Sequence, residues 1–171
     1  KSANLISKKL KRIYTESLMK DQFPYLGNKV LITQEMCDLN EHMNVLYYAK
    51  IFEDEFPFYT SLGFSSNYFE KGFSFFTLEM NIRYLKEMKK GETALPGFRY
   101  FAVKPKLIHY GGVIFNEAGD ACAISENVLV HVDMNTRRSC EMNDETIHHL
   151  NEMLNDHTST GAVDFELRLK I

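Results

Sequence analysis

The pattern of apolar and polar positions changes several times along the chain, and each change predicts a structural element. Residues 45–56 are apolar on most sides of a helix, so the pattern predicts a central helix that other structure covers. Asn44 is the last turn-forming residue before this run and is its expected N-cap. The preceding residues, 37–44, are polar and turn-prone, which predicts a loop that leads into the helix.

A period of two begins at Phe73 and predicts a long, half-buried strand at 73–84. The face predicted to lie on the core carries Phe76, Leu78, Met80, Ile82 and Tyr84, and the other face carries Thr77, Glu79, Asn81 and Arg83. Further strands are expected at 93–103, with a bulge or bend at Pro96 and Gly97, at 106–116, and in the segment where Cys122, Ile124, Val128, Val130 and Val132 share a side. Short turns join these strands, which predicts an antiparallel meander.

The remaining expected elements are a basic amphipathic helix at 4–20, a first strand at 29–35, a loop at 63–72, a helix at 144–155 capped by Asn143, and a short strand at 163–169. The charges of the first helix favour a solvated face over a membrane or nucleic-acid patch. An antiparallel sheet of this size can curl around one helix, which predicts an α+β domain. Its long strands leave an edge that a second copy usually covers.

Composition narrows the class of protein without changing this fold. The chain has 171 residues, a formal net charge of -3, and 13 Phe and 9 Tyr against no Trp; this suits one domain with an aromatic core and gives no reason to expect nucleic-acid binding. No apolar run is long enough for a membrane span, and no signal peptide core follows the basic N-terminal residues. Three cysteines without paired spacing, Cys37, Cys122 and Cys140, suit a reducing cytoplasm.

Candidate chemistry gathers just before the central helix. Asp38 and His42 lie where unpaired backbone N–H groups and the positive end of a helix dipole favour developing negative charge. A carboxylate there is suited to act as a general base or a nucleophile. The residues alone leave a second interpretation open, in which Asp38 and Asn44 only cap turns.

A resemblance to a known family adds to this interpretation. Residues 38–44, Asp-Leu-Asn-Glu-His-Met-Asn, followed by Tyr47, Tyr48 and Phe52, resemble the Asp-x-Asn-Gly-His-Met-Asn signature of hotdog-fold acyl-CoA thioesterases of the 4-hydroxybenzoyl-CoA thioesterase-like group. Further similar segments are 76–79, Tyr84 to Glu87, the Gly91 turn, and His131 to Asp133 with Arg137 and Arg138. Together they are most similar to the branch that includes betainyl-CoA thioesterases, over roughly residues 28 to 142.

The resemblance implies a hotdog fold, an antiparallel sheet wrapped around one central helix, with extra N- and C-terminal helices. The chain then divides into an N-terminal helical extension at 1–27, the thioesterase-like domain at 28–142, and a C-terminal helix and tail at 143–171. The implied substrate is an acyl-CoA, and the implied assembly is a homodimer or a homotetramer. No cofactor and no metal are expected, since coenzyme A is part of the substrate.

Functional residues are implied by the same resemblance. The catalytic carboxylate falls on Asp38, the carbonyl-polarising amide falls near Asn44 or Val45, and His42 is expected to orient its neighbours. The residues expected to bind substrate are Glu41, Tyr47, Thr77, Glu79, Arg137 and Arg138. Thr77 and Glu79 either lie near a dimer-related site or face solvent or an interface. Arg137 and Arg138 either pair with CoA phosphates or are ordinary surface charges.

One departure from the signature keeps an alternative function open. The family has Gly where this chain has Glu41, at a position that often needs free backbone angles or close approach of a ligand. The alternative is a non-catalytic acyl-CoA or lipid-binding hotdog domain. A hydratase ranks lower because its His-Phe-Pro pattern is missing, and the aromatic residues fit an aryl or fatty acyl pocket or a trimethylammonium cage. His148, His149, Glu152 and His157 have metal-like spacing, but on a solvated helix they do not predict a metal site.

Overall fold

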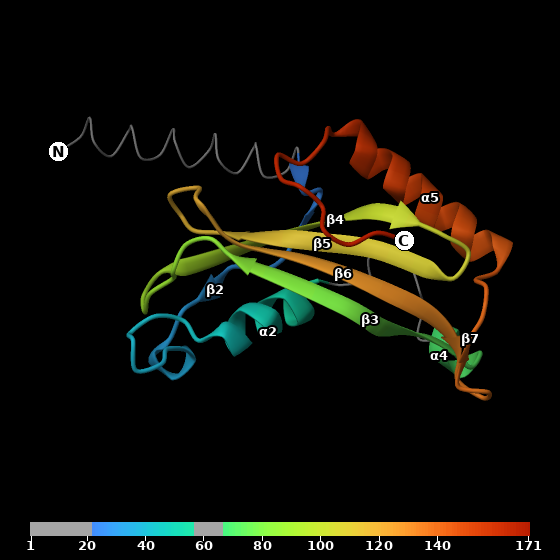
Figure 1. Ribbon diagram of the computed structural model, residues 1–171, viewed down its shortest axis with the longest axis horizontal. Coiled ribbons are helices and arrows are strands. Elements are labelled where there is room, and N and C mark those ends of the chain that lie inside the picture. The colour runs from blue at the N-terminus through green and yellow to red at the C-terminus, as the bar shows by residue number, and fades with distance from the viewer. Residues whose placement is uncertain (1–21, 57–66) are drawn as a thin grey trace. The chain divides into compact units, whose positions relative to one another are not determined.

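A computed structural model of the chain describes residues 22–56 and 67–171 (Figure 1). The basic helix predicted at 4–20 lies outside the described residues, as does the first part of the loop predicted at 63–72. The second part of that segment is not a loop, because it contains the short helix α4 (Asn67–Glu70). The sequence pattern misses this helix because four residues are too few to establish a helical period.

The strands of the described residues form a sheet in which neighbours follow the order β1-β4-β5-β6-β3, with β2 paired to β4 and β7 paired to β6. Their bounds are Tyr25–Leu26 (β1), Val30–Leu31 (β2), Phe73–Tyr84 (β3), Thr93–Val103 (β4), Leu107–Phe115 (β5), Ala121–Asp133 (β6) and Arg138–Ser139 (β7). The meander is confirmed for β4 to β6, but β3 lies beside β6 and not beside β4. After β3 the N–H groups of Leu85 and Lys86 donate to the carbonyl of Cys122, so the chain follows β6 instead of making a hairpin.

The described residues form two compact units. The first contains residues 22–56, 82–98 and 112–124, and the second contains residues 67–81, 99–111 and 125–171. The sequence division at 27/28 and 142/143 rests on the extent of a resemblance, and it stays a prediction.

In the first unit, α2 (Val45–Glu55) packs by one side against the strands (Figure 1). Phe52 meets Phe98 edge to face, with 6.3 Å between the ring centroids. Val45 and Leu46, on the first turn, are exposed. The single chain therefore buries the middle of the helix, while two apolar side chains at its N-terminus remain at the surface.

The strand predicted at 29–35 is much shorter in the structure. Only β2 is extended, and the 3₁₀ helix η1 (Gln34–Met36) follows, with an N–H of Met36 that donates to the Thr33 carbonyl at 3.2 Å. This local bond uses backbone groups that a longer strand would offer to a neighbour.

Strand β4 is continuous through Pro96 and Gly97, where the sequence predicted a bulge or bend. Strand β1, which the sequence pattern misses, pairs Leu26 with Gly97. A side chain at Gly97 would place its Cβ 2.9 Å from that of Phe23, so the glycine permits close packing.

Strand β3 differs from the prediction in which side chains it buries. Leu78 is 61% exposed, and Met80 and Tyr84, on the same predicted core face, are also exposed. Thr77 and Glu79, on the opposite face, are exposed as well, so the described residues cover neither face of the middle of β3, and β3 also ends the order of paired strands. The middle of β3 is therefore an exposed apolar edge.

In the second unit, α5 (Asp144–Ser159) confirms the predicted C-terminal helix and extends it by one turn. Its N-cap is Asn143, whose Oδ1 accepts the N–H of Thr146 at 2.8 Å. The strand predicted at 163–169 is absent. Two N–H groups of that segment, on Arg168 and Leu169, donate to the carboxylate of Glu126, so a side chain takes the place of a neighbouring strand. Within the part of the chain that the structure describes, no helix is long and apolar enough to cross a membrane.

Replacing Asn143 with Ala is expected to lower the free energy of unfolding by about 1 kcal/mol, because the first turn of α5 loses its side-chain cap. Urea denaturation followed by circular dichroism measures the change. Asn155→Ala is the matched control, since Asn155 is exposed on the same helix and its replacement is expected to leave stability unchanged or slightly raised. Equal losses in the two variants would contradict the capping role.

Candidate functional site

The loop at 37–44 is a tight hairpin held on both sides. Within it, the N–H of Asp38 donates to the His42 carbonyl at 3.1 Å, and Cys37 and Met43 form an antiparallel bridge. On the far side the N–H of Met43 donates to the Met88 carbonyl at 2.7 Å. Both methionines are buried, so hydrogen bonds and apolar packing together fix the loop.

The Asp38 carboxylate sits at the surface of this hairpin with one oxygen engaged. Its Oδ1 accepts the N–H of Asn40 at 2.8 Å, an Asx turn. The same oxygen is 3.7 Å from Nδ1 of His42, and 27% of the Asp38 side chain is exposed. The carboxylate is therefore oriented by its own loop and still reachable by a small molecule.

The N-terminus of α2 adjoins this loop and has one unpaired amide. Asn44 is the N-cap, as the sequence predicts: its Oδ1 accepts the N–H of Leu46 at 3.0 Å, and its carbonyl accepts that of Tyr47 at 3.0 Å. The N–H of Val45 has no hydrogen-bond partner within residues 22–56 and 67–171. An unpaired N–H at the positive end of a helix is a ready donor to an oxyanion.

Glu41 lies in the same loop in a strained conformation. Its φ is 62°, in the left-handed region that favours glycine. The backbone thus keeps the shape that the signature Gly would allow, and the loop accommodates Glu41 with an exposed side chain. The departure in sequence changes the side chain at this point without changing the turn.

Tyr48, on α2, helps to hold the loop in place. Its hydroxyl oxygen accepts the N–H of Met88 at 3.1 Å, next to the residue pair that holds the loop. Burial raises the pKa of Tyr48 to about 12, so the phenol stays neutral. Tyr47, the neighbour predicted to bind substrate, is half-buried on the first turn of α2.

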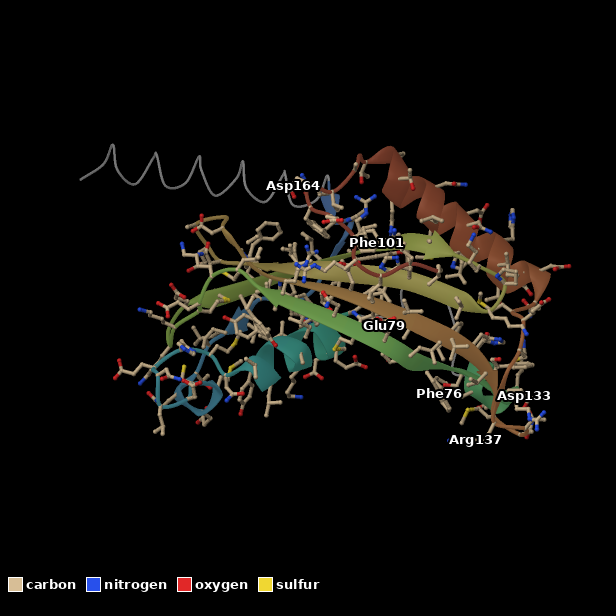
Figure 2. All side chains as sticks on the ribbon, in the orientation of Figure 1. Phe76, Glu79, Phe101, Asp133, Arg137 and Asp164 are labelled. Atoms are coloured by element: carbon tan, nitrogen blue, oxygen red, sulfur yellow. The ribbon has the colours of Figure 1, made fainter. Side chains whose placement is uncertain are left out.

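The other predicted substrate-binding residues belong to the second unit. Thr77 and Glu79 are exposed on β3, and Figure 2 labels Glu79 on this strand. Arg137 has a φ of 58° and places its guanidinium 5.1 Å from the centroid of the Phe76 ring, and Arg138 is exposed in β7. The predicted residues thus form two groups: one around Asp38 with Glu41, His42, Asn44, Val45 and Tyr47, and one on β3 and the turn before β7.

The second unit also contains a buried histidine, His131, which the sequence analysis cites only within a family motif. His131 receives the Tyr68 hydroxyl at its Nε2 at 2.6 Å, and its Nδ1 is 3.0 Å from the carbonyl and 3.3 Å from the Sγ of Cys140. Burial lowers the pKa of His131 and raises that of the Cys140 thiol. The pair is therefore neutral. Tyr68 and His131 are 63 positions apart in the chain, so no local spacing could have predicted their contact.

The histidines of the C-terminal helix do not come together. Among the described residues no three His, Cys, Asp or Glu side chains are placed to hold a metal ion. His148 lies 3.3 Å from Glu152 on the exposed side of α5, whereas His157 is buried. The sequence analysis placed His157 on a solvated face, which is wrong, because the last turn of α5 docks on β4.

Comparison with known proteins identifies the family. The thioesterase-like superfamily matches residues 32–150. The chain belongs to this superfamily. It is 30% identical over 132 residues to the L-carnitine dehydrogenase/betainyl-CoA thioesterase of Agrobacterium fabrum, a match that spans 72% of this chain and 27% of that protein. It is 26% identical to the betainyl-CoA thioesterase of Pseudomonas aeruginosa, over 74% of this chain and 81% of that one.

The chain thus spans about a quarter of the length of the bifunctional relative. Among solved structures, a hypothetical protein of Staphylococcus aureus in complex with CoA matches with a TM-score of 0.71 and 21% identity, over 86% of this chain and 93% of that one. This likeness confirms the predicted fold, an antiparallel hotdog sheet with few helices.

Replacing Glu41 with Gly is expected to raise the free energy of unfolding by about 1 kcal/mol, because a non-glycine residue pays for the left-handed conformation. Chemical denaturation measures the gain. Glu41→Ala removes the charge but keeps the Cβ, so no gain is expected from it. A gain with Ala and none with Gly would show that the carboxylate, and not the backbone angle, is the source of strain.

Proposed function

We propose that the protein hydrolyses an acyl-CoA thioester, with Asp38 as general base or nucleophile and the N–H of Val45 as oxyanion donor. The observation that carries this proposal is a hairpin that bears the accessible Asp38 carboxylate and leads directly into α2, whose first N–H, that of Val45, is unpaired among the described residues. The superfamily and the two relatives named as betainyl-CoA thioesterases support the reaction class. CoA in the Staphylococcus aureus protein supports the substrate class.

The chemistry follows from this pairing. The thioester carbonyl oxygen accepts a hydrogen bond from the Val45 N–H, which stabilises the negative charge that forms when the carbonyl carbon is attacked. Asp38 either removes a proton from an attacking water or attacks the carbonyl carbon itself. The C–S bond then breaks, and the CoA sulfur leaves as a thiolate that takes up a proton. In the first route the acid is released directly; in the second, water hydrolyses the mixed anhydride between the acyl group and Asp38, which releases the acid and restores the carboxylate. His42, near Asp38, helps to orient the carboxylate.

The charged and aromatic side chains near Asp38 indicate which acyl group to test first. Asp38 and Glu41 place two carboxylates on the loop, and Tyr47 offers an aromatic face on the adjoining helix turn. A quaternary ammonium group is attracted both to carboxylates and to aromatic faces. Betainyl-CoA is therefore the first substrate to test, beside aryl and medium-chain acyl-CoA thioesters.

The CoA moiety and the second subunit complete this proposal. Arg137 and Arg138 are suited to meet the CoA phosphates, since guanidinium groups bind phosphate through two hydrogen bonds. The exposed edge strand β3, with Leu78 and Met80 at its middle, suits pairing with a second copy. We place the thioester pocket where the α2 N-terminus of one copy meets the sheet of the other, near Thr77 and Glu79.

We also propose a cytoplasmic location, because all three cysteines are free thiols, which suits a reducing compartment.

A second candidate function rests on Glu41. A charged side chain at a position where the signature has Gly would stand where a ligand approaches the loop, which favours a domain that binds acyl-CoA without cleaving it. Turnover of any thioester in a broad panel decides for the enzyme. Binding of CoA in calorimetry, without turnover of any member of the panel, decides for the binding domain.

Replacing Asp38 with Asn is expected to reduce kcat at least 100-fold, on the order of the loss of a general base or nucleophile. The Asn Oδ1 can still accept the Asn40 N–H, so the loop should keep its shape. Release of free thiol from acyl-CoA measures the rate. Asp54→Asn, which removes an exposed carboxylate of α2 paired with Lys50, is the matched control and should keep the wild-type rate. If Asp38→Asn retains most of the activity, this mechanism is wrong.

Replacing Leu78 with Asp is expected to convert a dimer into monomers and to abolish turnover, because a charge would be buried between two β3 strands. Sedimentation velocity measures the mass. Leu31→Asp is the control, since Leu31 is 58% exposed and Leu78 is 61% exposed, but Leu31 lies on β2. A wild-type monomer with full turnover would contradict the proposed assembly.

A further inference from the structure

The last residues of the chain are fastened to the sheet by side chains instead of strand pairing. Arg99, on β4, is 5% exposed. Its two terminal nitrogens donate to the carbonyl of His157 at 2.8 Å and to that of Gly161 at 2.9 Å. A guanidinium at the C-terminus of α5 matches the negative end of the helix dipole. This arginine therefore fixes the point where the helix becomes the tail.

His157 makes the next contact, and it does so as an acceptor. The backbone N–H of Tyr100 donates to Nδ1 of His157 at 2.9 Å. The two rings are stacked, with centroids 5.3 Å apart and planes 13° apart. A nitrogen that accepts a hydrogen bond carries no proton, so the ring is neutral and its single proton lies on Nε2. A second proton on Nδ1 would face the Tyr100 N–H and break this bond.

The tail itself is tied to a buried carboxylate. Glu126 on β6 is 0% exposed, and its Oε2 accepts the N–H of Arg168 at 2.9 Å and that of Leu169 at 3.1 Å. Nε2 of His109 lies 3.3 Å from the same oxygen. Phe165 packs edge to face on Phe101 of β4, with 6.4 Å between the ring centroids; Phe101 is labelled in Figure 2. These contacts leave the tail without a partner strand but firmly placed.

Burial and neighbouring charged groups shift the pKa values of His157 and His109. Burial, and to a smaller extent Arg99 of β4, lower the pKa of His157 to about 4, against the opposing effect of Asp156 of α5. Burial also lowers the pKa of His109, against the opposing effect of Glu126 on β6. The side chains of Asp164, Glu166, Arg168 and Lys170, in the tail, are exposed. Both buried histidines are thus held in their neutral forms.

We propose that residues 157–171 form a latch that is closed on strands β4 to β6 while His157 is neutral and opens when His157 takes up a second proton. Opening breaks the Tyr100–His157 bond and, with it, the adjoining contacts of Arg99 and Glu126. The latch gives this chain a response to acid that is separate from the loop of Asp38 and from the proposed hydrolysis.

The direction of the response follows from proton linkage. In the closed state the pKa of His157 is about 4, and in the open, hydrated state it returns to its ordinary value of about 6.5. The stability of the closed state is then fully present above about pH 6.5 and is lost as the pH falls from about 6.5 towards 4. Between pH 7 and pH 5 the opening equilibrium of the latch rises roughly twentyfold.

Amide hydrogen exchange followed by NMR tests the proposal on the full chain. The protection of the Tyr100, Arg168 and Leu169 amides, corrected for the pH dependence of intrinsic exchange, is expected to fall together by roughly twentyfold from pH 7 to pH 5. Protection that does not change over this range, or that changes at Tyr100 alone, would overturn the latch.

Two variants and one direct titration complete the test. His157→Asn keeps an acceptor near the Nδ1 position but cannot be protonated, so most of the pH response should disappear. His148→Gln, at an exposed position of the same helix, should respond as the wild type does. If His157→Asn does not fold, the wild-type ring is titrated by NMR. A ring that titrates near 6.5 while the Tyr100 amide stays protected overturns the proposal, and one that titrates together with loss of protection supports it.

Discussion

The N–H of Val45, at the positive end of α2 and without a partner in the part of the chain that the structure describes, is the feature on which the proposed chemistry depends. Asn44 uses its side chain and its carbonyl to pair the next two amides, which leaves this one donor free. The buried side chains further along α2, those of Tyr48, Ile51 and Phe52, fix the helix axis and so hold this donor still. The N-cap therefore does two things: it starts the helix, and it decides which amide remains available.

Asp38 is placed by a chain of contacts that ends in the core. Its loop is closed by its own backbone, the loop is held by Met43 and Met88, and Met88 is in turn held by the Tyr48 hydroxyl. Tyr48 belongs to the same helix that presents Val45. Carboxylate and donor are thus two ends of one hydrogen-bonded and packed arrangement, which keeps the geometry of both fixed. Glu41 bears the strain of the tight turn within that arrangement.

Local sequence patterns predict which helices and strands form better than they predict which strands lie side by side. The bounds of β3 and β4, the two N-caps and the signature loop are visible in the sequence because each depends on a few adjacent residues. The position of β3 beside β6 is not visible, because it depends on how the segment after Tyr84 pairs with Cys122. The same alternation in β3 predicts a buried face at any position in a sheet, so it could not reveal that this face lies at an edge.

The partners of buried polar groups are a second feature that the sequence does not predict. Glu126 lies in the apolar row of β6, and its carboxylate meets two amides from a tail far along the chain and the ring of His109 on β5. In the sequence His157 is one of several polar residues on a helix, but in the structure its Nδ1 accepts a hydrogen bond from a backbone N–H of β4.

The catalytic proposal is tested by a measurement that locates the substrate carbonyl relative to Val45 and Asp38. A crystal structure with a non-hydrolysable acyl-CoA analogue tests it most directly. The account predicts the carbonyl oxygen within about 3.1 Å of the Val45 nitrogen, with the Asp38 carboxylate facing the carbonyl carbon. An analogue bound with its carbonyl away from both groups would contradict it.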